Sequence, residues 1–171
     1  MAIELMQGLI LLWFLRAREW TPEKLGVAPI ELRDFLHPIL LLVTVILVSW
    51  GAYYLATAIR PDLAINNVGL DEEGVPAAIA ISFSLVNAAY EEIFVCAYIV
   101  AAWRGTDTWT AIAISSVIRL AYHLYQGPLA IAMIFPMGVL MAWYFASQRR
   151  VLPLILTHAV LDIIAFWQNG A

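Results

Sequence analysis

Six apolar segments, separated by short polar loops, occupy most of this chain, and this alternation restricts its fold more than any other feature. A helix that crosses a bilayer needs about 20 consecutive apolar residues, because its backbone must satisfy its own hydrogen bonds without water. The segments comprise residues 3–15, 36–59, 76–103, 108–125, 129–147 and 152–167. The first is short, which is typical of an anchor or a tilted span. We expect an all-α polytopic membrane bundle of about six transmembrane helices.

The composition agrees with a membrane protein. The chain of 171 residues is 63% hydrophobic and 13% charged, with a mean hydropathy of +0.84, whereas soluble domains are about half apolar and about a quarter charged. The net charge of -4 offers no basic face for nucleic acid. We expect one membrane domain, with N-terminal helices and an interfacial loop in residues 1–75 and a core of four helices in residues 76–171.

Basic residues between the segments predict an orientation, because loops rich in lysine and arginine stay in the cytoplasm. One side of the predicted bundle carries Arg16, Arg18, Lys24, Arg33, Arg104, Arg149 and Arg150. The other side carries only Arg60. The sequence therefore predicts a multi-pass integral membrane protein with one strongly basic, cytoplasmic side, and its compact form suits a prokaryotic plasma membrane.

Ionisable residues lie inside three of the apolar segments. Each such residue costs roughly 2.5–3.5 kcal/mol at the centre of a membrane helix, and such residues usually face one another or a wet cavity. The third segment carries Glu91 and Glu92, the fourth Arg119 and His123, and the sixth His158 and Asp162. We expect these six side chains to pair with each other in one site, on core helices.

Helical spacing supports a shared cavity. Arg119 and His123 are four residues apart, as are His158 and Asp162, so each pair occupies one face of its helix. Asn87 lies four residues before Glu91 and extends the polar stripe of that helix. Adjacent glutamates point about 100° apart, so only one of them can face the cavity squarely. His123 and Asp162 lie near helix ends on the side without basic residues, which predicts that the cavity opens on the non-cytoplasmic side.

This set of side chains can activate water. A carboxylate and a histidine in a semi-dry pocket can take a proton from water, and a second histidine can donate to a developing oxyanion. Asp162 can orient His158, as carboxylates often do for imidazoles. Tyr122, Tyr125 and Gln126 flank this site and are candidate substrate contacts. The predicted chemistry is hydrolysis of a carbonyl compound inside a membrane.

Three ordered segments, "YEEIFVCA", "IRLAYHLYQGP" and "LTHAVLDII", resemble the CPBP family of CAAX-processing and bacteriocin-processing intramembrane glutamic proteases. The resemblance covers roughly residues 76–167. It implies that Glu91, helped by His123, activates water, that Glu92 supports it, and that His158 and Asp162 stabilise the oxyanion. It also implies a peptide bond as the substrate, in a peptide or a membrane-anchored protein, and neither a metal nor another cofactor.

The chain departs from the pattern of that family at two positions. The family pattern places an arginine after the glutamate pair, where this chain has Cys96, and a phenylalanine four residues before the first histidine, where it has Arg119. One arginine is lost and another is gained on the neighbouring helix. We therefore expect Arg119 to pair with Glu92 or Glu91 in place of the missing arginine.

Three other functions are compatible with these residues. Two glutamates, two histidines and an aspartate could bind zinc in a metal-dependent hydrolase, although the chain lacks an HExxH motif. A catalytically inactive binding or scaffold protein could keep the cavity without the reaction, and the two departures leave room for it. A proton-coupled carrier also uses acid–histidine chains, but the absence of an evident internal repeat counts against it.

Overall fold

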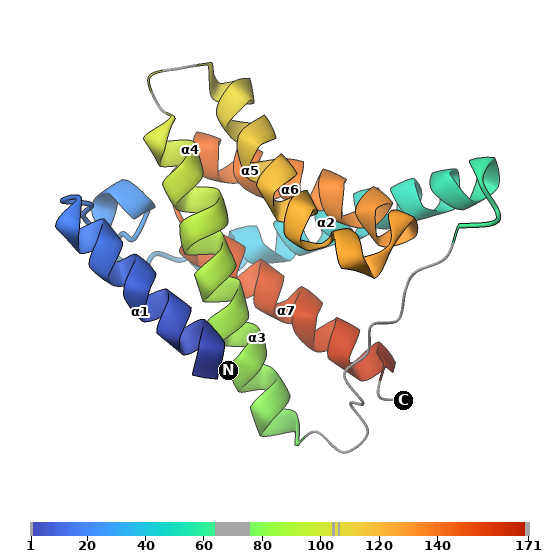
Figure 1. Cartoon of the computed structure of the whole chain (residues 1–171), viewed down its shortest axis with the longest axis horizontal. Coiled ribbons are helices and arrows are strands. Elements are labelled where there is room, and N and C mark those ends of the chain that lie inside the picture. The colour runs from blue at the N-terminus through green and yellow to red at the C-terminus, as the bar shows by residue number, and fades with distance from the viewer. Residues whose placement is uncertain (1, 64–75, 104, 106, 170–171) are drawn as a thin grey trace.

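The computed structural model describes residues 2–63, 76–103, 105 and 107–169, and all its regular elements are helical (Figure 1). They are α1 (Ala2–Ala17), η1 (Glu23–Leu25), α2 (Arg33–Ile59), α3 (Ala77–Glu91), η2 (Glu92–Tyr98), α4 (Ile99–Ala102), α5 (Thr108–Tyr122), η3 (Leu124–Gln126), α6 (Pro128–Gln148) and α7 (Leu152–Asn169). Because α3, η2 and α4 are continuous, these residues form six helices, as predicted. Arg104 and residue 75, the last of the predicted N-terminal part, lie outside the described ranges.

Local sequence signals determine where the helices begin and end. The Asp107 side chain accepts a hydrogen bond from the Thr110 backbone N–H and caps α5. Pro128 opens α6, where its missing N–H is not needed. Gly127 connects η3 to α6 with a φ of 88°, a conformation that favours glycine. The fourth helix, expected to reach residue 125, ends at Tyr122 and continues as the short η3 turn.

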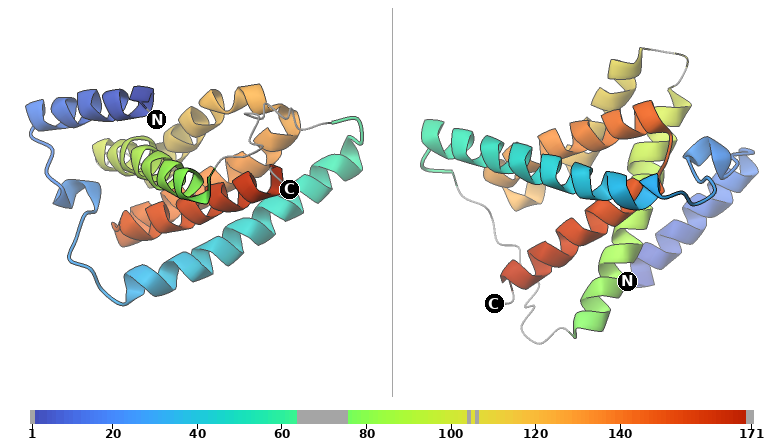
Figure 2. Two further views of the ribbon diagram at one scale, coloured as in Figure 1. Left: turned by 90° about the horizontal axis from the view of Figure 1, so that it is seen from below. Right: turned by 180° about the vertical axis from the view of Figure 1, so that it is seen from behind.

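The helices are arranged in layers around α6 and α7 (Figure 2). Helix α6 packs against α2 on one side and α5 on the other, and α7 packs against α2 and α3. Helix α1 touches the bundle mainly beside α3. The apolar core joins α2, the α3–α4 helix, α5, α6 and α7 through side chains such as Val45, Ile112, Met141, Phe145 and Leu154. The helices from residue 77 onward thus enclose a common interior.

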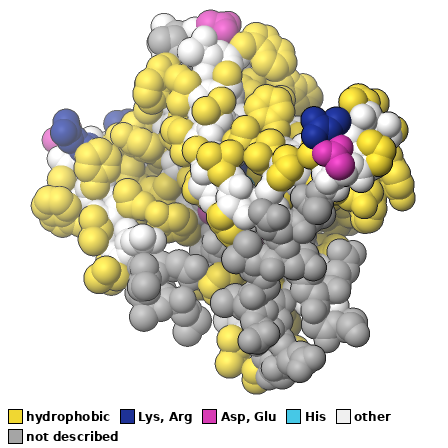
Figure 3. Space-filling model, turned by 45° about the vertical axis from the view of Figure 1, so that its right-hand side comes forward, with side chains coloured by type: hydrophobic (Ala, Val, Ile, Leu, Met, Phe, Trp, Pro, Cys, Tyr) yellow, Lys and Arg dark blue, Asp and Glu magenta, His cyan; other side chains and the backbone are white. Residues whose placement is uncertain are grey.

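Three of the six helices are long and apolar enough to cross a membrane. These are Arg33–Ile59, Ala77–Ala102 and Pro128–Gln148, while Met6–Ala17 and Leu152–Trp167 are apolar but shorter. Helix α5 has 15 residues and carries Arg119. Large apolar side chains are exposed along α2, and the face shown in Figure 3 is largely apolar with a few charged groups. The chain is therefore a helical membrane bundle whose shorter helices pack among longer ones.

Two of the three loops predicted to share the basic side meet at one end of the bundle. The Arg150 guanidinium, which follows α6, donates to the Asp34 carboxylate at the start of α2, to Glu31 and to the Pro29 carbonyl. The hydrogen bonds to Asp34 raise the pKa of Arg150 above its ordinary value. The Val151 N–H also donates to the carbonyl of Gly26 at 3.1 Å. These contacts fasten the loop before α2 to the α6–α7 loop.

Replacing Arg150 tests whether this cluster fastens the basic end. Arg150→Met leaves the buried Asp34 carboxylate without its partner, and we expect the melting temperature in detergent to fall by roughly 3–10 °C. Arg33→Met is the matched control, because Arg33 pairs with Glu31 at an exposed position and should change stability little. Equal melting temperatures for both variants would contradict a fastening role for Arg150.

Candidate active site

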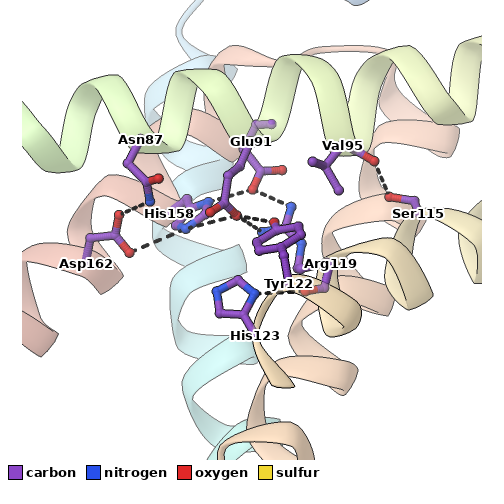
Figure 4. A network of polar contacts seen from close by, with 10 residues as sticks. Asn87, Glu91, Val95, Ser115, Arg119, Tyr122, His123, His158 and Asp162 are labelled. Carbon is purple, nitrogen blue, oxygen red and sulfur yellow. Dashed lines mark hydrogen bonds and ion pairs between the residues drawn. The ribbon is translucent and has the colours of Figure 1, made fainter. Parts of the chain in front are cut away.

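Polar side chains from three helices meet inside the bundle (Figure 4). Helix α3 and η2 supply Asn87, Glu91 and Glu92, α5 supplies Arg119 and Tyr122 and is followed by His123, and α7 supplies His158 and Asp162. All six ionisable residues predicted to share one site lie in this region. The fourth core helix, α6, packs behind them.

The Arg119 guanidinium bridges the two adjacent glutamates. Its Nη1 lies 3.1 Å from Glu91 Oε2 and its Nη2 lies 2.7 Å from Glu92 Oε1. The side chain is 1% exposed, so its charge depends on these carboxylates for compensation. The prediction that Arg119 pairs with one glutamate is confirmed, and it extends to both. A planar guanidinium can do this because its two terminal nitrogens donate in different directions.

A π-helical segment starts at Glu92, so the change of helix type falls between the two glutamates. In η2 the backbone winds more widely than in an α-helix, and a helix of this kind leaves carbonyls in need of other donors. The Ser115 hydroxyl on α5 donates to the Val95 carbonyl at 2.7 Å. Ser115 thus joins the widened turn to the helix that carries Arg119. The sequence-based prediction did not include Ser115. Its spacing of four residues from Arg119, which places both on one face of α5, is the signal that could have identified it.

Helix α6 contributes to the site by leaving space for the guanidinium. A Cβ atom at Gly138 would lie 3.3 Å from the Arg119 Cδ and 3.5 Å from the Ser116 Cα. A side chain at this position would therefore require Arg119 to shift by a few tenths of an ångström. The glycine lies in an otherwise apolar helix, and the sequence pattern does not distinguish it from a packing glycine.

His158 lies among three carboxylates. Its Nδ1 is 2.7 Å from Glu92 Oε1, and its Nε2 is 3.4 Å from Asp162 Oδ1 and 3.9 Å from Glu91 Oε2. A doubly protonated imidazolium suits this arrangement, because each ring nitrogen then presents an N–H group to a carboxylate oxygen. The contacts of Nε2 are longer than ordinary hydrogen bonds. The Nε2–H group is therefore held in place yet weakly engaged.

Asp162 links the polar side chains of its own helix, α7, to those of α3. It lies one helical turn after His158, and its Oδ2 accepts a hydrogen bond from Asn87 Nδ2 at 2.9 Å. Asn87 therefore orients the carboxylate that lies beside the His158 ring. This is the polar stripe on α3 that the spacing of Asn87 and Glu91 predicted.

His123 follows the last residue of α5 and lies beside the Tyr122 ring, with ring centroids 4.5 Å apart. Its Nδ1 is 2.8 Å from the Arg119 backbone carbonyl. A carbonyl only accepts, so Nδ1 carries the proton and the other nitrogen of the neutral ring is an acceptor. Figure 4 shows this second nitrogen turned toward the side on which Asp162 lies. His123 can therefore accept a proton or bind a water there.

The two glutamates have different surroundings. The Glu92 side chain is completely buried, and its Oε1 accepts from both Arg119 and His158. The Glu91 side chain keeps 9% of its surface exposed, and its Oε2 accepts from Arg119 and, at 2.5 Å, from the Tyr122 hydroxyl. Within the described part of the chain, no hydrogen bond to Glu91 Oε1 occurs. The Glu92 Oε2 also has no hydrogen-bond partner among the described residues, but it is completely buried. Glu91 is thus the carboxylate of the pair that keeps exposed surface for another partner.

The three flanking residues predicted to touch substrate have different positions. Tyr122 belongs to the network itself through its bond to Glu91. Tyr125 and Gln126 lie on the η3 turn, where the Gln126 amide donates to the Tyr125 hydroxyl at 3.1 Å. Sequence spacing could not separate Tyr122 from the others, because all three follow Arg119 within seven residues.

A comparison with protein families places these residues in a known group. Residues 73–164 match the model described as Rce1-like, type II CAAX prenyl endopeptidase, which covers more than half of the chain. The chain belongs to this Rce1-like family. No curated protein and no solved structure matches it. Membership in this endopeptidase family implies a membrane protease, a hydrolase that acts on a peptide or protein.

All six ionisable residues of the site lie inside the part of the chain that matches the Rce1-like family. The position at which the resemblance leads one to expect an arginine is Cys96, which is completely buried in η2. Arg119 enters from α5 and reaches the glutamates from the opposite helix. The positive charge beside the glutamates is therefore present, although it comes from another helix.

Exchanging the two positions tests whether the charge has moved between helices. Arg119→Phe removes the cation that bridges the two buried carboxylates, and we expect a fall in melting temperature of roughly 10 °C together with loss of cleavage. Cys96→Arg alone adds a second buried cation and should also lose activity. The double variant should regain much of both properties. A fully stable and active Arg119→Phe single variant would show that the charge is not needed.

Proposed function

We propose that this protein is an intramembrane endopeptidase of the glutamic type, which hydrolyses a peptide bond with a water activated by Glu91 and needs no metal ion. The observation that carries the proposal is the difference between the adjacent glutamates. Glu92 is completely buried, with one oxygen engaged by Arg119 and His158 and the other enclosed without a partner among the described residues, whereas Glu91 keeps exposed surface.

In the proposed reaction, Glu91 Oε1 and the acceptor nitrogen of His123 hold the water. Glu91 takes one proton from the water as its oxygen attacks the carbonyl carbon of the peptide bond, and the carbonyl electron pair moves onto oxygen. The Nε2–H of His158 donates to this oxyanion, because its bond to Glu92 fixes the ring and Asp162 lies beside it. Glu91 then gives its proton to the leaving amine.

The donor set favours this mechanism over a metal centre. The Arg119 guanidinium lies against both glutamates, where a cation bound by the pair would have to sit. Among the residues that the structure describes, no group of three or more histidine, cysteine, aspartate or glutamate side chains has the geometry to hold a metal ion. The proposed charge stabilisation therefore comes from Arg119 and His158.

We also propose that the site opens on the non-cytoplasmic side of a prokaryotic plasma membrane. The support is its position at the C-terminal end of α5, opposite the end at which Arg149 and Arg150 meet the loop before α2. Such an opening suits an exported substrate, either a peptide or a membrane-anchored protein. The protease would cut this substrate internally or at its C-terminal anchor.

Cleavage of a peptide library by the purified protein tests the function. We expect Glu91→Gln to lower the rate by roughly 10²–10⁴-fold, because glutamine cannot take the proton from water. Glu23→Gln, in the exposed η1 turn, is the matched control and should cleave normally. Products are identified by mass spectrometry, with and without chelator. Loss of cleavage on adding chelator would assign the site to a metallohydrolase, and full activity of Glu91→Gln would remove Glu91 from the mechanism.

Cysteine labelling tests the proposed opening. Gln126→Cys lies at the site end and Ser147→Cys at the basic end, and the parent chain gives the background because its single cysteine, Cys96, is buried. We expect a membrane-impermeant maleimide to label position 126, and not position 147, in intact cells. The reverse pattern would place the site on the cytoplasmic side.

A further inference from the structure

The Tyr122 hydroxyl makes the shortest hydrogen bond of Glu91. It donates to Glu91 Oε2 at 2.5 Å, and the same oxygen receives Arg119 Nη1 at 3.1 Å. The ring ends α5, is 37% exposed, and lies against the His123 ring. Tyr122 therefore stands between the buried charges and the side of the site that a substrate can reach. A residue that only bound the substrate would not need this hydrogen bond to Glu91.

Besides Arg119, two further side chains with donor groups face Glu91 Oε2. The His158 Nε2 lies 3.9 Å from Glu91 Oε2, the oxygen to which Tyr122 donates. The two donors come from α7 and α5, so they reach this point from different helices. An oxygen placed near Glu91 Oε2 would lie within reach of both. Oxyanion sites are built in this way, from preformed donors aimed at the point where charge develops.

We propose that the Tyr122 hydroxyl is a catalytic hydrogen-bond donor, which holds Glu91 in the resting protein and passes its hydrogen bond to the substrate oxyanion during water attack. This inference rests on the proposed function. When Glu91 takes the water proton, it becomes a neutral acid and a weaker acceptor. The new C–O bond forms as the carbonyl electron pair moves onto oxygen, and this oxyanion becomes the stronger acceptor for the Tyr122 hydroxyl.

The second half of the reaction returns the donor. As the carbonyl re-forms, the C–N bond breaks and the leaving nitrogen takes the proton from Glu91. Glu91 is again a carboxylate and accepts from Tyr122. The phenol keeps its own proton throughout, so no co-reactant is required. Tyr122 thereby couples the protonation of Glu91 to the availability of an oxyanion donor.

Tyr122→Phe tests the inference, since it removes one hydroxyl and keeps the ring. On a substrate whose cleavage depends on Glu91, we expect kcat to fall by roughly 10²–10³-fold with KM changed less than about threefold, because the lost bond forms only in the transition state. Binding of a tetrahedral transition-state analogue should weaken by a similar factor. Tyr54→Phe, on the exposed face of α2, is the matched control and should be normal.

Other outcomes separate the possible roles of Tyr122. A raised KM with unchanged kcat would make it a substrate contact only, and normal kinetics would overturn the inference while leaving the Glu91 mechanism intact. A Glu91→Gln variant that cleaves at the wild-type rate would instead overturn the proposed function. Should Tyr122→Phe fail to fold, Tyr122→His is compared with Tyr122→Leu. Only histidine carries a donor, so equal activity of these two variants would also overturn the inference.

Discussion

The site depends on one buried cation shared by two adjacent carboxylates. In an apolar bundle Glu91 and Glu92 would repel each other and lack hydration, and Arg119 compensates both from the facing helix. Other features serve this contact. Gly138 leaves room for the arginine stem, and Ser115 supports the widened turn that begins at Glu92. The three helices that carry charges are thereby held in one arrangement, because moving any of them would leave a buried charge unpaired.

Identical side chains acquire different chemistry from their surroundings. Glu92, completely buried, accepts from Arg119 and His158 and acts as a fixed negative charge. Glu91, one residue earlier, keeps some exposure. This asymmetry is what a water-activating carboxylate requires, since the base must be held in place yet retain an oxygen for its substrate. The proposed roles of Glu91 and Tyr122 follow from that difference.

The two ends of the bundle serve different needs. At the basic end, Arg150 joins the loop before α2 to the α6–α7 loop through Asp34, Glu31 and a backbone carbonyl. The end of α6 and the start of α7 therefore meet at a fastened corner. The polar network lies farther along the bundle, midway along the α3–α4 helix and α7 and at the end of α5, where α5 stops at Tyr122 and His123 follows outside the helix. A rigid base with reactive groups at the far end suits a site that must admit a peptide into a membrane protein.

The sequence by itself determined the helices, and it predicted that Glu91, Glu92, Arg119, His123, His158 and Asp162 lie close together. These follow from local rules: apolar length, helical spacing and the cost of charge in lipid. Tertiary structure decided which glutamate stays available, that Arg119 reaches both, and that Tyr122 contacts Glu91. The π-helical turn at Glu92 and the clearance at Gly138 are likewise invisible in a periodic pattern. The physical reason is that spacing along a helix sets direction, whereas a hydrogen bond between helices depends on how they pack, to within an ångström.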